Sequence, residues 1–170
     1  VLDGVSGTTE FEIPLSFEPE NGVAIGDIDG DECAEIFTNE NQGNGDLAAF
    51  DCNGDPLWTA VVGDKVGLIA LADFDGDGNA ELYYGDEIRN AATGAVIVAE
   101  SGNMEVDYTQ GSIAVDILAD SECADCSGLE LITGNEIWAI NIGAGTKTLV
   151  RDMNTVLASQ GISGTYHPKY

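Results

Sequence analysis

Two acidic segments place carboxylates at a spacing that suits a bound metal ion. In each nine-residue segment, acids occupy the first, third, fifth and last positions: Asp27, Asp29, Asp31 and Glu35 in one, and Asp73, Asp75, Asp77 and Glu81 in the other. Calcium takes roughly six to eight oxygen ligands, so alternating acids on one tight turn can converge on a single ion. Glycines within the segments allow the backbone to bend sharply. The sequence therefore predicts two calcium loops.

These loops belong to a longer repeat. The apolar stretches that precede and follow each loop align in three places: 22–27 with 35–37, 67–73 with 81–85, and 111–116 with 130–134. The leading aspartate recurs about every 45 residues, which is the length of one four-stranded propeller blade. Turns such as Asn53-Gly54 and Thr93-Gly94 alternate with the loops and predict hairpins. Each repeat is therefore expected to contain a strand, an acidic loop, a second strand and a hairpin.

The expected fold is all-β, with four-stranded propeller-type blades in about three and a half repeats. The predicted division is a partial first blade (an outer hairpin) at 1–21, blades with calcium loops at 22–66 and 67–110, a blade with an altered loop at 111–152, and a C-terminal extension or the start of another blade at 153–170. Within this last part, only 153–160 could hold a helical turn. A closed propeller needs about four blades or more. We therefore expect a fragment of a larger propeller or a ring that neighbouring chains complete.

The third loop departs from the frame. Asp116 and Glu130 keep its two ends and Asp120 holds the third position, but Leu118 replaces the second acid. An insertion then lengthens the loop, and two interpretations are open. A disulfide in the insertion replaces the metal as the staple of this loop. Alternatively, Asp120, Asp125 or Glu122 rebuilds a third calcium site.

The loops resemble those of FG-GAP/VCBS repeats, the calcium-binding blades of integrin-α-like propellers, over about residues 1–150. The resemblance implies side-chain ligands from Asp73, Asp75, Asp77 and Glu81 with the backbone carbonyl of Asn79, and in the first loop from Asp27, Asp29, Asp31 and Glu35 with the carbonyl of Cys33. In the first loop, Glu32 stands where the second loop has Gly78. If that position needs a positive φ, the glutamate costs about 1 kcal/mol. The Phe-Gly and Gly-Ala-Pro signatures of the family are absent.

Four cysteines allow three disulfide pairings. We favour Cys33 with Cys52, within one repeat, and Cys123 with Cys126, across a short turn. Both bonds imply an oxidising compartment, and hence an extracellular or cell-surface location. A redox-active Cys-x-x-Cys motif and a zinc site are the alternatives, but the sequence lacks the expected helix context and has only one histidine.

The charge and the apolar content of the chain exclude some classes of binding partner. The net charge of −26 argues against binding of nucleic acid or of an anionic membrane. No apolar run is long enough to span a bilayer, so no membrane insertion is expected. The indole of Trp58 is expected to pack between blades.

Catalytic constellations are sparse. His167 is the only histidine, and no phosphate-binding loop or dinucleotide fingerprint is present. We expect a non-enzymatic, calcium-stabilised extracellular module for adhesion, or for surface-fibre or filament assembly. Its partner would be a protein or glycan surface ligand, or a second copy bound through blade edges. The alternative is a carbohydrate-active propeller, a polysaccharide lyase or lectin that uses calcium, with Lys65 or Arg89 facing a uronate.

Overall fold

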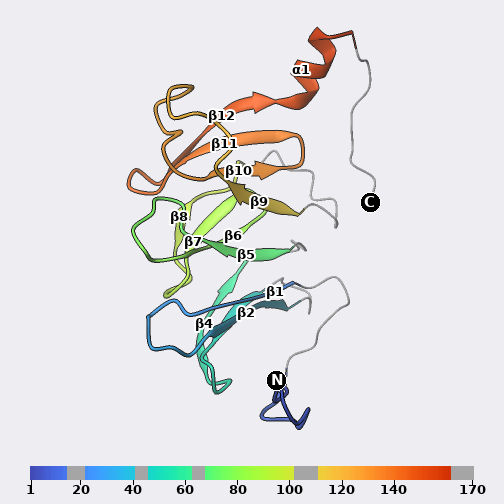
Figure 1. Ribbon diagram of the computed structural model, residues 1–170, viewed down its shortest axis with the longest axis vertical. Coiled ribbons are helices and arrows are strands. Elements are labelled where there is room, and N and C mark those ends of the chain that lie inside the picture. Colours follow the sequence, from blue (N-terminus) through green and yellow to red (C-terminus); the bar gives the residue numbers. More distant parts are fainter. Residues whose placement is uncertain (15–21, 41–45, 63–67, 102–110, 162–170) are drawn as a thin grey trace.

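The chain forms three four-stranded antiparallel sheets and one short helix. The computed structural model describes residues 1–14, 22–40, 46–62, 68–101 and 111–161. The sheets follow one another along the long axis of the molecule, with the N-terminal turn at one end and helix α1 (Met153–Ser159) at the other (Figure 1). The described strands form no closed barrel. The expectation of an all-β fold with four-stranded blades is confirmed.

Each sheet is a simple meander in which every strand pairs with its neighbours in sequence. The first contains β1 (Val23–Gly26), β2 (Glu35–Glu40), β3 (Asp46–Phe50) and β4 (Pro56–Val61). The second contains β5 (Ile69–Ala72), β6 (Glu81–Tyr84), β7 (Glu87–Asn90) and β8 (Val96–Val98). The third contains β9 (Ser112–Val115), β10 (Glu130–Thr133), β11 (Glu136–Asn141) and β12 (Thr146–Asp152). Residues 1–14 form a turn closed by a bridge between Leu2 and Thr9.

Alternation along the strands gives the second sheet two apolar faces, because successive side chains point to opposite sides. In β6, Leu82 and Tyr84 lie in the core shared with the first sheet. The intervening Tyr83 lies in the core shared with the third sheet. The middle sheet is therefore covered on both sides, and stacking buries surface that a single sheet would leave in water.

Trp58 links the first two sheets as expected. Its ring packs at the edge of their shared core, and its Nε1 donates a hydrogen bond to the carbonyl of Ala91 at 2.8 Å. The ring also lies against Gly94, where an added Cβ would approach the indole to 2.6 Å. Gly94 has a φ of 72°, so both its backbone and the adjacent indole favour glycine there.

A buried ion pair links the second and third sheets. Lys147 of β12 reaches the turn between β6 and β7, where its Nζ lies 2.6 Å from Asp86 Oδ2 and also donates to the carbonyls of Asp86 and Ala99. The side chains of Lys147 and Asp86 are only 7% and 2% exposed. Burial raises the pKa of Asp86, but hydrogen bonds from Lys147 and Ser101 outweigh it and hold the pKa below its usual value.

The loop between β1 and β2 contains a strained residue. Glu32 has a φ of 70°, and among the described residues it is the only non-glycine with a positive φ. The equivalent residue between β5 and β6 is Gly78, with a φ of 92°. The position therefore needs a left-handed backbone, which the glutamate adopts at a cost.

Replacing Lys147 with methionine should destabilise the protein by about 3–5 kcal/mol, because Asp86 would be left buried without its cation. Since the pKa of Asp86 is depressed, the contribution is present at neutral pH and is lost as the pH falls through the folded-state pKa. Urea unfolding at pH 7 measures the difference. Arg151→Met is the control, because its pair with Glu122 is exposed and should contribute less than about 1 kcal/mol. Equal losses in the two variants would contradict this role for Lys147.

Replacing Glu32 with glycine should stabilise the protein by about 0.5–1 kcal/mol, because relief of left-handed strain exceeds the added entropy of the unfolded chain. The reciprocal change, Gly78→Glu, should destabilise it by a similar amount. Both are measured by urea unfolding in EGTA, so that metal affinity does not contribute. Loss of stability in Glu32→Gly would show that the glutamate side chain outweighs the backbone strain.

Candidate metal centres

The loops between the first two strands of the first and second sheets share one hydrogen-bond framework. The leading aspartate of each accepts from backbone amides of the loop: Asp27 from Gly30 and Glu32 at 2.7 and 3.1 Å, and Asp73 from Gly76, Asp77 and Gly78 at 2.8, 3.1 and 2.9 Å. The third acid of each, Asp31 or Asp77, accepts from the amide two residues later at 2.8 Å. These contacts curl each loop around its own carboxylates.

The last acid of each loop is buried at the start of a strand. Glu35 opens β2 and is 4% exposed, and its Oε2 accepts from the amide of Ile28 at 2.9 Å. Glu81 opens β6 and is 5% exposed, and its Oε2 accepts from the amide of Phe74 at 3.0 Å. Each glutamate thus closes its loop by binding the amide that follows the leading aspartate.

Three of the predicted acids come together in each of these two loops. Oxygens of Asp27, Asp29 and Glu35 lie within 4.8 Å of one another, and so do oxygens of Asp73, Asp75 and Glu81. Asp31 and Asp77 lie outside these groups, and each accepts from the backbone amide two residues later, as Asp29 and Asp75 also do at 3.2 and 3.3 Å. The sequence therefore located two acidic groups that could hold a metal ion, and the structure brings three of the four acids of each loop together and leaves the fourth outside.

No ion pair among the described residues joins a basic side chain to the acids of these two loops. Burial raises the pKa of the Glu81 carboxyl, and the negative charges of Asp75 and Asp73 raise it further. Hard divalent cations prefer such all-oxygen groups, so the residues present fit calcium. Cys33 is bonded to Cys52, which leaves only its backbone carbonyl as an oxygen donor at that position.

The third loop is built differently. Glu130 is fully buried, and its Oε2 accepts from the amides of Ile117 and Leu118 at 2.9 and 3.0 Å. Its Oε1 is buried with no hydrogen-bond partner among the described residues, which is the remaining feature of a cation site here. Within 111–161, however, Asp116 and Asp120 do not join Glu130 in a converging group.

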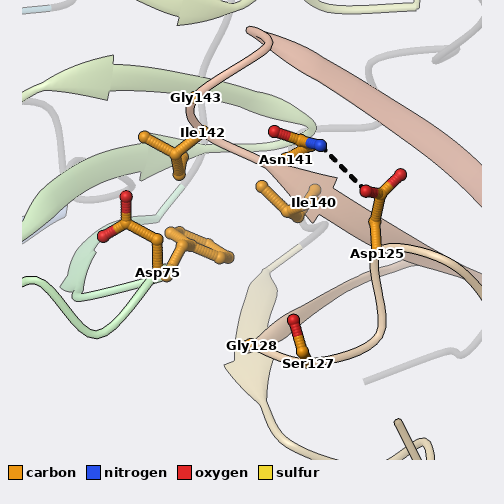
Figure 2. A pocket seen from close by; sticks show the side chains of 9 residues that line it. Asp75, Asp125, Ser127, Gly128, Ile140, Asn141, Ile142 and Gly143 are labelled. Atoms are coloured by element: carbon orange, nitrogen blue, oxygen red, sulfur yellow. Dashed lines mark hydrogen bonds between the residues drawn. The ribbon is translucent and has the colours of Figure 1, made fainter. Parts of the chain in front are cut away.

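The acids considered for rebuilding this third site are bound elsewhere. Asp125 accepts a hydrogen bond from the side-chain amide of Asn141 at 2.8 Å (Figure 2), and Glu122 forms an ion pair with Arg151. Cys123 and Cys126 form a disulfide in the same insertion. These contacts favour the interpretation in which the disulfide replaces the metal as the staple of this loop.

A shallow cavity of about 170 Å³ lies between the second loop and the third sheet (Figure 2). Asp75 stands on one side and Ser127 on the other, while Ile140 and Ile142 come from the end of β11 and the following turn. The carbonyl of Phe74, one of the lining residues, accepts from the backbone amide of Leu129 at 3.1 Å. The second loop is thus joined to the third sheet by its backbone.

Sequence reasoning missed the residue that follows each leading aspartate. Phe74 donates its amide to Glu81, while its ring lies in the core between the second and third sheets and meets Tyr83 edge-on at 5.6 Å. Ile28 holds the same place beside the core of the first two sheets. An apolar residue inside an otherwise acidic loop was the available signal.

Of the two cations considered for a lyase, Arg89 is unsuited to that role. Arg89 is 8% exposed, pairs with Glu87 at 2.6 Å and donates to the carbonyl of Gly94. Lys65 and His167 lie outside the described residues. The two disulfides are compatible with an extracellular location, and no described helix is long and apolar enough to cross a membrane.

Comparison with known proteins gives a short, partial match. No protein-family model and no solved structure matches the chain. Over 45 residues it is 51% identical to the BBSome complex member BBS2 of Rattus norvegicus and of Mus musculus, and 49% identical to that of Homo sapiens. The match covers 26% of this chain and 6% of each relative. The chain is therefore similar to a small part of a protein described as a member of a complex.

Proposed function

We propose that this chain is a calcium-stabilised, non-enzymatic propeller-type module of the FG-GAP/VCBS kind that serves extracellular adhesion or assembly. The observation that carries the proposal is the equivalence of two acidic loops in successive sheets. Both bring three carboxylates together and both use a buried glutamate to fix the loop to a strand. Such repetition is typical of a structural element that belongs to the blade.

Calcium supplies positive charge that offsets mutual repulsion of the clustered acids. Asp27, Asp29 and Glu35 would hold one ion. Asp73, Asp75 and Glu81 would hold the other. In each trio the two aspartates come from the loop and the glutamate from the strand, so an ion bound by all three joins loop to sheet.

A structural role for the ion follows from what the loops contact. Ile28 and Phe74 lie beside the leading aspartates, and their side chains enter the cores between sheets. A fixed loop therefore stabilises the stacking of two sheets as well as its own conformation. Among the described residues, no contact joins these loops to a side chain placed as a nucleophile or general base.

Several features support an extracellular assembly role. The disulfides suit an oxidising compartment, and the net charge of −26 suits a solvated surface. The first strands of the first and third sheets also expose apolar side chains, with Val23 and Ile25 at 55% and 65% and Ile113 at 60%. Apolar surface of this kind is typical of contact with another protein. The partial similarity to a member of a complex agrees with this role.

Saturating calcium should raise the melting temperature relative to excess EGTA, because an ion that binds only the folded state stabilises it, by about 2.7 kcal/mol at a hundredfold excess over Kd. Scanning calorimetry measures the shift. In the double variant Asp29→Asn/Asp75→Asn, the shift should be largely lost.

The matched control is Asp55→Asn, which removes one exposed carboxylate outside the loops and should keep the full shift. Magnesium at the same concentration tests whether the response is specific for calcium. An unchanged transition in EGTA would count against structural calcium.

Incubation with pectin-like polyuronates should release no unsaturated sugar, with or without calcium, because Arg89 is buried and paired. Absorbance of the unsaturated product near its ultraviolet maximum is the measurement, with a known lyase as positive control. Release of product that requires calcium would overturn the non-enzymatic assignment.

A further inference from the structure

One face of every sheet has the same makeup. In the first sheet Phe37 pairs with Ala49, which pairs with Trp58, and all three lie in or against the core shared with the second sheet. The equivalent side chains of the second sheet form a paired row in the core shared with the third: Tyr83, Ile88 and Val98. We call this the docking face, because in both sheets it holds the next sheet of the chain.

In the third sheet, the corresponding residues are Ile132 and Ile137, which pair with each other, and Val150 at the bulge of β12. This docking face holds no further sheet among the described residues. Instead Ile132, Ile137 and Val150 form a core with Leu118, Cys123 and Cys126 from the inserted loop. Cys126 is fully buried there and Leu118 is 6% exposed.

The inserted loop packs against the docking face of the third sheet in the way that a following sheet packs against the first two. Ile28 and Phe74 follow their leading aspartates and enter the core on the docking side of their own sheets. In the third repeat, Leu118 lies two residues after Asp116 and enters the core on the docking side, and the surface that completes this core is the disulfide turn. Arg151 paired with Glu122, and Asn141 bound to Asp125, hold that turn against β12 and β11.

We propose that the Cys123–Cys126 loop takes the place of a further sheet and closes this docking face, and that opening the disulfide exposes the face to a second copy of this chain. The occupant follows from the fold, because the two equivalent faces are each covered by a sheet of this same chain. The proposal does not depend on calcium.

The chemistry of opening is ordinary thiol–disulfide exchange. A dithiol attacks the Cys123–Cys126 bond, the sulfur–sulfur bond breaks, and two protein thiols form as the dithiol becomes a disulfide. Cys123 is partly exposed, while Cys126 is buried, so attack at Cys123 is the accessible route. Without the bond, four residues lose the constraint that packs Cys126 onto Ile137 and Ala139.

The test uses the full chain with Cys123→Ser/Cys126→Ser, and with Cys33→Ser/Cys52→Ser as the matched control. Amide hydrogen exchange in β10 and β11 should accelerate about tenfold or more in the first variant, while β2 and β3 stay protected. Sedimentation velocity should show a concentration-dependent dimer for this variant alone. Adding Ile137→Asp should abolish the dimer, because a charge would be buried at the contact.

A second measurement avoids dependence on how well the variants fold. In the natural chain, a dithiol should produce the same loss of protection in β10 and β11, and reoxidation should restore it. Unchanged exchange after verified reduction of Cys123–Cys126 would overturn the closing role of the loop. Loss of protection in a chain that stays monomeric would overturn the assignment of this face to a second copy.

Discussion

The structure depends on a buried carboxylate that opens the second strand of every sheet. Glu35, Glu81 and Glu130 are each almost wholly removed from water, and a buried carboxylate is costly unless hydrogen bonds or a cation satisfy it. Backbone amides of the preceding loop provide the hydrogen bonds. The start of each loop must therefore lie next to the first residue of the strand that follows it. In the first two sheets this proximity brings the remaining acids together.

The same hydrogen bonds between glutamate and loop amides also influence how the sheets stack. The amide bound by each glutamate belongs to an apolar residue or its neighbour, so the apolar side chain is carried into the core on the docking side. Phe74 shows the full coupling, since its amide binds Glu81, its ring enters the core and its carbonyl binds the third sheet. The clustering of acids, the loop conformation and the stacking of sheets are thereby parts of one arrangement. The third repeat keeps the buried glutamate and the apolar loop residue, but there the apolar residue packs against the Cys123–Cys126 turn instead of a following sheet.

Local spacing made much of this predictable. The acids of both loops and the glycines between them lie within nine residues, so their geometry follows largely from the loop itself. The inter-blade packing of Trp58 was anticipated from its place just after a hairpin turn, and 153–160 was the one segment expected to hold a helical turn. The division of acids was not, because Asp31 and Asp77 match the spacing as well as Asp29 and Asp75 do. Only the folded loop shows which three carboxylates converge.

The sequence by itself determined the all-β class, the repeat length, the two acidic loops and the cysteine pairs worth considering, since each depends on residues close along the chain. The tertiary structure alone decided what joins the sheets. Lys147 and Asp86 are 61 residues apart, and neither has a local pattern that marks it as buried and paired. It also decided that the Cys123–Cys126 turn lies on the docking face of the third sheet. Such contacts arise from packing between repeats, where the spacing of residues within one repeat carries no information.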